Sequence, residues 1–306
     1  MTKAHNGLKN EHLVRPVLHP ELQPCQRYAK QRFVAERASA PGTVFSPYFL
    51  VRTLERASGL RRKLDLLCAP QVIQRWREAI LTNVNDLPDS VRRLLSGHRH
   101  DGGPLDGPHL AFIPLAFVDH PHADGHLHGM GLVLPEAISP DDHQCALSAI
   151  SRVDRLLLGR LGVWRIGCIE ATPPLRDLHP RLWTAYPQGA RQWSTVTPIA
   201  FDWHPKTRDS VRYRSEVARM ITQACLRIGL PEPREVIVTS VSALLGAPPV
   251  HAYPRLERKD GSLRCQTHAI LIFEEPVCGP ILLGAGRFLG YGVCRPLDLP
   301  RLSMEV

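Results

Sequence analysis

Histidine is concentrated in one short part of this sequence. Seven of the fifteen histidines fall within 31 residues, where an even spread would place one or two: His98, His100, His109, His120, His122, His126 and His128. The imidazole group titrates near neutral pH, so it can both accept and donate a proton, and it is also the commonest metal ligand in proteins. The cluster therefore indicates either proton-transfer catalysis or metal binding.

The densest part of the cluster comes close to a known metal-binding pattern. Residues 120–126 read His-Pro-His-Ala-Asp-Gly-His, which resembles the HxHxDH signature of metallo-β-lactamase-like hydrolases. Gly125 stands where that signature has a histidine, and His126 comes one place late. A binuclear site is therefore disfavoured. A mononuclear zinc or manganese site built from the HxH pairs stays open, as does a surface hairpin in which most of these histidines have no chemical role.

A second candidate is the glycine-rich segment over residues 279–292, hereafter the glycine loop. Its Gly-Ala-Gly at 284–286 is weak as a dinucleotide fingerprint, because no helix is predicted to follow it. Glycines let a backbone approach a phosphate closely, their amides can form an anion-binding nest, and Arg287 can neutralise charge. Phe288 could stack on a base or anchor the loop in the core, and the pattern favours the anchor.

The charge balance of the chain is basic. Lys plus Arg number 38 against 29 Asp plus Glu, a formal net charge of +9, and 32 of the 38 are Arg. This excess fits GC-rich codon usage, and it equally fits a phosphate-binding surface. No apolar run is long enough for a membrane helix and no secretory leader is visible, so a cytoplasmic protein is expected. The eight cysteines form no CxxC pair, which predicts reduced thiols.

The hydrophobic pattern predicts how the first half is organised. Residues 1–45 read as a polar arm, and the leucine spacing over 46–82 predicts helices with an exposed basic face. A turn-rich loop at 96–104 is followed by predicted strands over 109–118 and 126–134, a helix over 141–158 and a strand over 164–171. Pro114 would place the first of these strands at a sheet edge or bulge.

The second half repeats this element order. It comprises a strand over 195–201, an amphipathic helix over 210–228, strands over 235–241 and 268–273, and a final strand after the glycine loop. We therefore expect an α+β fold of tandem ferredoxin-like (RNA-recognition-like) units preceded by a helical N-terminal segment. The expected division is 1–95 for the arm and helical segment, 96–200 for the first unit and 201–306 for the second.

Several segments together resemble one protein family. They are Ser96-Gly97-His98, residues 108–115, residues 122–125, Thr195-Val196-Thr197-Pro198 and residues 279–296. In this order, over about residues 45–300, they resemble the subtype I-U (I-G) CRISPR-associated proteins that fuse a Cas-five-like half to a Cas-six-like half. The present chain resembles mainly the Cas-six-like, RNA-processing half. The fused proteins are usually longer, with the Cas-five-like portion ahead.

The resemblance implies a metal-independent endoribonuclease that needs no cofactor. It would cut CRISPR repeat RNA by attack of a 2′-hydroxyl on the adjacent phosphate and then remain with the crRNA and the other subunits of a type I effector complex, with no membrane contact. A subunit that binds crRNA without cutting it is the first alternative. A metal-dependent hydrolase using the cluster from His98 to His128 is the second.

The same motifs give the candidate residues. His98, His109 and His122 are the predicted catalytic histidines. Predicted RNA contacts come from the glycine loop and from a histidine on a late strand: Gly284, Gly286, Arg287, Phe288, Gly290 and His268.

Overall fold

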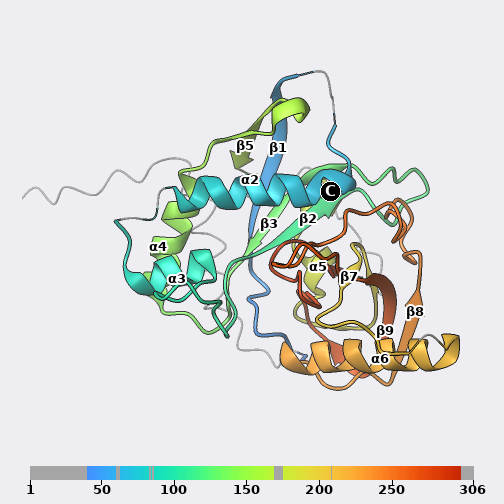
Figure 1. The fold of residues 1–306 in the computed structure, drawn as a ribbon. Coiled ribbons are helices and arrows are strands. Elements are labelled where there is room, and N and C mark those ends of the chain that lie inside the picture. Colours follow the sequence, from blue (N-terminus) through green and yellow to red (C-terminus); the bar gives the residue numbers. More distant parts are fainter. Residues whose placement is uncertain are drawn as a thin grey trace, which may run out of the picture.

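A computed structural model describes residues 40–59, 63–82, 84, 86–168, 175–207 and 209–297. Most of the predicted N-terminal arm, residues 1–39, lies outside this part of the chain. The described elements form two antiparallel sheets with helices packed against them (Figure 1).

The first sheet has strand order β2-β3-β1-β5-β4. Its strands are β1 (Leu50–Ser58), β2 (Ala111–Ala116), β3 (Leu127–Val133), β4 (Arg155–Leu157) and β5 (Val163–Cys168). Its helices are α2 (Ala69–Leu81) and α3 (Asp89–Ser96), between β1 and β2, and α4 (Pro140–Ser151), between β3 and β5. Without the short β4, this is the ferredoxin-like βαββαβ order. Figure 1 shows α2 lying across the sheet.

The second sheet repeats this arrangement with one change. The strands β6 (Ala190–Thr195), β8 (Glu235–Thr239), β9 (Gln266–Val277) and β10 (Cys294–Pro296) lie in the order β10-β6-β9-β8, and the short β7 (Ile199–Ala200) pairs with β9. Helix α6 (Ser210–Arg227) connects β6 and β7 to β8. The glycine loop stands between β9 and β10, where a second ferredoxin helix would be. The predicted α+β fold of tandem ferredoxin-like units is therefore confirmed.

Short helices complete the described elements. One four-residue helix and three single turns of 3₁₀ helix connect the strands: α5 (Arg181–Thr184), η2 (Leu66–Cys68), η3 (Gly159–Leu161) and η4 (Arg176–Leu178). No helix among the described residues combines the length and the apolar character that crossing a membrane requires.

The prediction of helix over residues 46–82 is wrong at its start. Residues 50–58 form β1, which pairs with β3 on one side and with β5 on the other. Leu50 and Leu54 are four residues apart, as on a helix face, but two strand repeats also bring them to one face of a sheet. Pairing on both edges decides between the two patterns. Helix begins only at residue 66 with η2.

Three further predictions concern the end of a helix, the position of Pro114 and the domain limits. The helix predicted over 141–158 ends at Ser151, and residues 155–157 form β4 instead. Pro114 does lie on an edge strand, because β2 is the first strand of its sheet. The domain limits at residues 95 and 200 stay predictions, and the sheets themselves divide elsewhere: the first contains strands from residue 50 to 168 and the second from residue 190 to 296.

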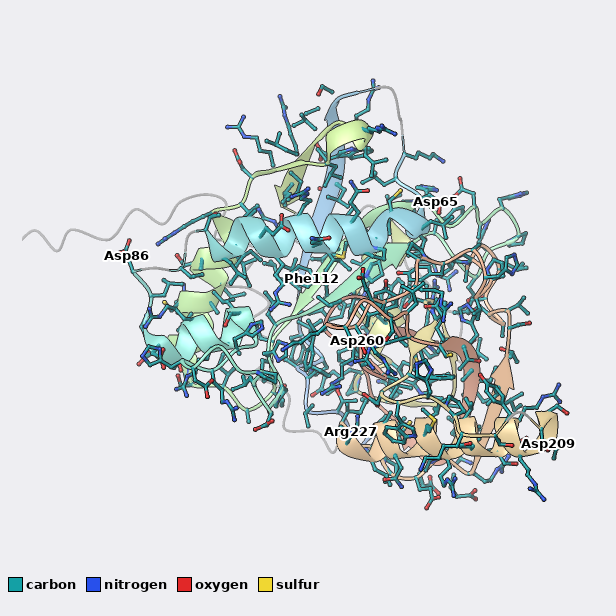
Figure 2. The ribbon with its side chains drawn as sticks, viewed as in Figure 1. Asp65, Asp86, Phe112, Asp209, Arg227 and Asp260 are labelled. Atoms are coloured by element: carbon teal, nitrogen blue, oxygen red, sulfur yellow. The ribbon has the colours of Figure 1, made fainter. Side chains whose placement is uncertain are left out.

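Buried contacts pack the helices onto the first sheet and also join the two sheets. In the first unit, Trp76 of α2 packs against Phe112 of β2 with ring centroids 6.4 Å apart, and Phe112 lies beneath α2 (Figure 2). Arg295 of β10 is 1% exposed, and its Nη1 donates to the Asp177 carboxylate at 3.1 Å and to the Val118 carbonyl at 3.0 Å. Arg295 thus connects β10 of the second sheet to the segment that follows β2 of the first.

Candidate functional site at the junction of the two units

The glycine loop meets the first unit at a pair of stacked rings. His109 lies just before β2 and is 8% exposed, and Phe288 projects from the glycine loop. Their ring centroids are 3.5 Å apart and their planes differ by 25°. The edge of the Phe288 ring also meets Phe45, with centroids 6.0 Å apart. Phe288 therefore anchors the loop, as the sequence favoured, and does so against a predicted catalytic histidine.

The end of α3 covers another side of His109. Gly97 ends this helix in the left-handed conformation, with φ of 68°, and its N–H donates to the Arg93 carbonyl at 2.8 Å. A β-carbon at Gly97 would collide with the His109 ring at Nε2. Only glycine suits both the backbone angle and this close approach.

His98 follows Gly97 directly and is exposed. Its Nδ1 lies 2.9 Å from the Ser96 carbonyl oxygen, a contact that orients the ring. The turn at the end of α3 thus holds one exposed histidine next to one buried histidine.

Burial and positive charge keep His109 neutral. Burial is the largest cause and lowers the pKa of His109, and the positive charges of Arg77 and Arg287, together with His98, lower it further. A hydrogen bond to the Gly107 carbonyl acts in the opposite direction. The net effect lowers the pKa to about 4. His109 is therefore an uncharged ring at neutral pH.

The two arginines come from different units. Arg77 of α2 donates to the Ser96 carbonyl, and burial lowers its pKa. In the glycine loop, Arg287 donates to the Gly284 carbonyl at 3.1 Å, and its guanidinium carbon lies 4.5 Å from the centre of the Phe288 ring. We call the group formed by Arg77, His98, His109, Arg287 and Phe288 the junction site.

The predicted glycines serve packing within the protein. Gly284 has φ of +80° and lies against the Ala200 carbonyl, Gly286 lies against Tyr291, and Gly290 has φ of +76° and lies against Ile73 of α2. These close approaches position the glycine loop against both units.

The expected anion-binding nest is not formed by most of the loop amides. Seven of them donate to protein carbonyls: Gly279, Leu283, Ala285, Arg287, Leu289, Tyr291 and Gly292. The correction has a simple cause, since the loop replaces a helix and must satisfy its backbone internally.

Two other predicted site residues, His122 and His268, lie away from the junction site. His122 lies on the connection after β2, whereas His109 precedes β2, so the strand separates them by about 20 Å at ~3.3 Å per residue. His268 of β9 has no exposed surface. Its Nδ1 lies 2.8 Å from the Thr195 hydroxyl and its Nε2 lies 2.9 Å from the Pro248 carbonyl. His268 is a hydrogen-bonded core residue, and its predicted RNA contact is corrected accordingly.

Three further histidines of the cluster surround Phe117. The rings of His120, His126 and His128 lie 5.3 to 5.6 Å from the Phe117 ring, and Asp124 accepts from His126 Nδ1. Within the described part of the chain, no three His, Cys, Asp or Glu side chains are grouped to hold a metal ion. The geometry therefore gives the metal-hydrolase alternative no support.

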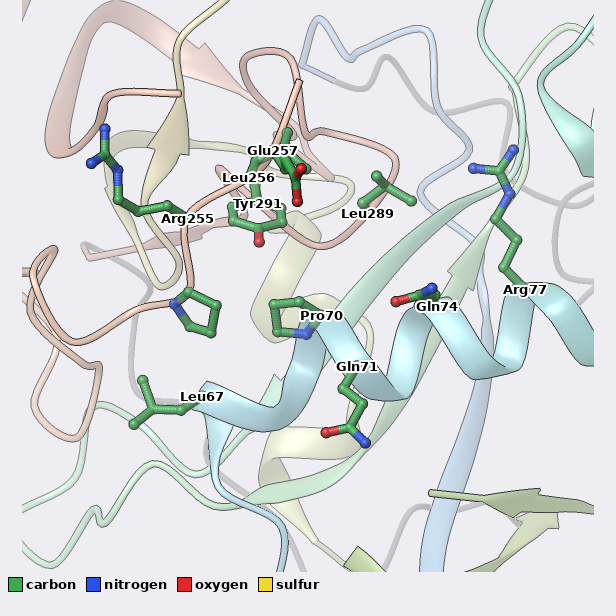
Figure 3. Close-up of a pocket in the computed structure, with 11 residues that line it drawn as sticks. Leu67, Pro70, Gln71, Gln74, Arg77, Arg255, Leu256, Glu257, Leu289 and Tyr291 are labelled. Carbon is green, nitrogen blue, oxygen red and sulfur yellow. The ribbon is translucent and has the colours of Figure 1, made fainter. Parts of the chain in front are cut away.

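A cavity of about 460 Å³ opens beside the junction site (Figure 3). Helix α2 and one residue of η2 form one wall, the segment 254–257 forms the other, and two residues near the end of the glycine loop complete the lining: Leu67, Pro70, Gln71, Gln74, Arg77, Pro254, Arg255, Leu256, Glu257, Leu289 and Tyr291. Arg77 belongs both to this lining and to the junction site. The cavity is large enough for a nucleotide-sized ligand.

Sequence reasoning missed several of these residues. Arg77 falls within the basic face predicted over residues 46–82, where nothing singles it out, and no role at the site is predicted for Phe45 or Tyr291. Arg77 carried one usable signal, a position on the same predicted helix as the buried Trp76. Nothing in the sequence indicates that segment 254–257 lies opposite α2.

Comparison with known proteins identifies the family of this chain. The sequence model of the family described as CRISPR-associated protein, GSU0054 family, matches residues 23–296. This chain belongs to that family. The match covers both ferredoxin-like units and the glycine loop of this CRISPR-associated protein. A search of curated proteins finds no match.

Solved structures give weaker likenesses. The product of a Cas6-related gene from Pyrococcus furiosus is 10% identical, with a TM-score of 0.41 over 82% of this chain and 100% of that chain. A Cas6b crystal structure is 11% identical, with a TM-score of 0.42 over 81% and 99%. A RAMP protein binding different RNA substrates is 11% identical, with a TM-score of 0.38 over 82% and 100%. The fold assignment rests on the strand order of this chain itself.

Proposed function

We propose that this CRISPR-associated protein cleaves CRISPR repeat RNA at the junction site, without a metal ion. One observation carries the proposal. The neutral ring of His109 is clamped between the two units by Phe288, with Arg77, Arg287 and the exposed His98 around it. Family membership supports a role in a CRISPR system.

The reaction is an internal transfer at phosphorus. The 2′-oxygen loses its proton and bonds to the adjacent phosphorus, while the bond from phosphorus to the 5′-oxygen breaks and that oxygen gains a proton. The products are a 2′,3′-cyclic phosphate and a 5′-hydroxyl. A proton-transfer group and fixed positive charge for the phosphate are what this chemistry needs. Histidine and arginine side chains supply both.

The geometry suggests different roles for the two histidines. His98 is exposed, so we assign it contact with the RNA and transfer of a proton. His109 is almost fully buried, so we assign it the role of a positioning residue that holds the turn carrying Gly97 and His98 against the glycine loop. Arg77 and Arg287 would stabilise the negative charge that grows on the phosphate.

The test uses purified protein and a repeat RNA taken from a CRISPR array of the source genome, in buffer with excess EDTA. We expect cleavage to persist and its products to carry a cyclic phosphate. RNA with a 2′-deoxy nucleotide before the cleaved bond should stay intact, because the nucleophile is missing. Cleavage that stops in EDTA and returns with a divalent metal would overturn the metal-free proposal.

The burial of His109 favours one alternative, a subunit that binds crRNA without cutting it. In that case the junction site would only hold RNA, and the same incubation would give tight binding and intact RNA. We further propose assembly with other subunits of a type I CRISPR effector complex; family membership supports the CRISPR association itself. Purification of that complex with its crRNA would identify those partners and test the proposed I-U (I-G) assignment.

A further inference from the structure

We infer that the cavity beside the junction site binds one unpaired, amino-bearing nucleobase of the RNA, with adenine the best fit. This inference rests on the proposed function, because it takes the ligand to be the RNA that enters the junction site. It goes further by assigning base selection to Gln74 and Tyr291.

Tyr291 gives the first reason. Tyr291 is only 3% exposed, yet its hydroxyl points into the cavity toward Pro70 (Figure 3). Burial raises its pKa to about 12, so the hydroxyl is a neutral group that can donate a proton. Its ring packs edge-on against Tyr253 with centroids 5.3 Å apart, and within the described residues its hydroxyl bonds to no protein atom. The hydroxyl is accessible from the cavity and is not bonded to the protein, so it can donate to a ligand.

Gln74 gives the second reason. Its Nε2 donates to the Glu78 carboxylate at 3.1 Å, which leaves Oε1 free to accept. Figure 3 shows the Gln74 amide at the cavity edge, whereas the Gln71 amide points away from Tyr291 and donates to the Leu158 carbonyl at 3.2 Å. The cavity therefore presents the Gln74 Oε1 acceptor on α2 and the Tyr291 hydroxyl donor on the opposite side, where the Glu257 carboxylate is a second acceptor and Arg255 a further donor.

This pair of groups selects among bases. Adenine and cytosine carry an amino group, which donates, beside a ring nitrogen that accepts. Uracil has a carbonyl oxygen where these bases carry the amino group and an N3–H where they have the accepting ring nitrogen, so its donor and acceptor are in the reverse order. Gln74 Oε1 can accept from the adenine amino group, which is one half of the bidentate glutamine–adenine pairing, because Nε2 is held by Glu78. The larger adenine would also cover more of the apolar walls formed by Pro70, Leu256 and Leu289.

The position of the cavity sets where in the RNA this base lies. Leu289 follows Phe288, the ring that stacks on His109, and Arg77 lines the cavity while bonding to the turn that carries His98. Arg255 stands on the opposite wall. A base held here would thus be an immediate neighbour of the cleaved phosphate, with an arginine on each side for the backbone.

Binding of short RNAs tests the inference without any cleavage. The probes are fluorescein-labelled 2′-O-methyl nonamers of uridine with a central A, C, G or U, which lack the nucleophile. Fluorescence anisotropy with the full-length protein should give Kd values about fivefold or more lower for central A than for central U. Tyr291→Phe and Gln74→Ala should each reduce that ratio below about twofold. Tyr213→Phe and Gln223→Ala, both on α6, are the matched controls and should keep the wild-type ratio.

Two results would overturn the inference. One is equal binding of all four nonamers by the wild-type protein, and the other is a preference for A that survives in both cavity variants. Tyr291→Phe removes a single oxygen, and a thermal melt of each variant separates loss of the base contact from loss of the fold. If the preference is present but unmodified repeat RNA is never cut, the proposed cleavage fails and the base site stands. If the RNA is cut without any preference, the base site alone fails.

Discussion

The rings of His109 and Phe288 stack at 3.5 Å, although one comes from the first ferredoxin-like unit and the other from the second. The contact places the glycine loop, which replaces a helix of the second unit, against the turn that ends α3. The contact therefore links the two units and brings Arg287 close enough to His109 to lower its pKa.

Replacing Phe288 should weaken the junction. We expect Phe288→Ala to lower the free energy of unfolding by about 1–3 kcal/mol, because the ring is half-buried and loses its contacts with His109 and Phe45. Urea unfolding followed by circular dichroism measures this change. Phe288→Tyr keeps the stacked ring and serves as the control. An unchanged free energy in Phe288→Ala would show that the stack does not hold the two units.

Gly97→Ala tests the close approach to His109. The variant must place a β-carbon against the His109 ring at a residue with positive φ, so we expect slower RNA cleavage together with a loss of about 2–4 kcal/mol in stability.

Gly102→Ala is the matched control for that variant. Gly102 also has a positive φ, of 79°, but a β-carbon there would meet nothing within 4 Å. It should therefore show only the backbone penalty, about 1–2 kcal/mol. Equal effects of the two variants would remove Gly97 from the account of the junction site.

Acid should destabilise the fold through His109. Its folded pKa of about 4 lies below the ordinary value of about 6.5, so the neutral ring contributes its stability fully above pH 6.5. That contribution is lost as the pH falls from 6.5 toward 4. By pH 5 the loss in the free energy of unfolding is about 2 kcal/mol.

Urea unfolding at pH 7.5 and pH 5.0 measures this loss. His128, His179 and His268 have pKa values lowered by burial and add to it with the same sign. His109→Phe keeps the stacked ring and has no titrating group, so the difference between the two pH values should shrink by about 2 kcal/mol in this variant. A difference as large as in the wild type would mean that His109 does not titrate in this range.

The sequence predicts much of this fold, because strands and helices in both units carry clear periodicity and sharp glycine or proline ends. It misses β1, since leucines four residues apart suit a helix as well as a strand face and only pairing with β3 and β5 resolves the choice. In the second unit the order of elements is predicted correctly, but the strand expected over 195–201 is displaced: β6 is Ala190–Thr195, and only the two-residue β7 (Ile199–Ala200) lies inside the expected range.

The candidate site is predicted in part. His98, His109 and the glycine loop come together, as the family motifs imply. His122 and His268 do not join them, because a residue's type says nothing about which end of a strand it occupies or whether its ring is buried. Tyr291 and segment 254–257 become visible only when distant parts of the chain are placed side by side.

RNA binding should depend on salt through Arg77. Arginines that neutralise phosphates release counterions, so Arg77→Gln should reduce the slope of log Kd against log salt by about 0.7 for single-stranded RNA. Arg75 of the same helix already pairs with Glu78 at 2.7 Å, so Arg75→Gln should leave the slope nearly unchanged. Titrations of 2′-O-methyl repeat RNA from 50 to 300 mM salt would measure both. Identical slopes for the two variants would place the phosphate path away from Arg77.

The central claim is that the junction site, and not the remainder of the histidine cluster, performs the proton transfer. The most direct measurement compares single-turnover cleavage of repeat RNA in EDTA by wild-type protein, His98→Ala and His122→Ala. We predict a fall of about 100-fold or more in rate for His98→Ala with RNA affinity retained, and a wild-type rate for His122→Ala. A wild-type rate for His98→Ala, or a comparable loss for His122→Ala, would contradict the account.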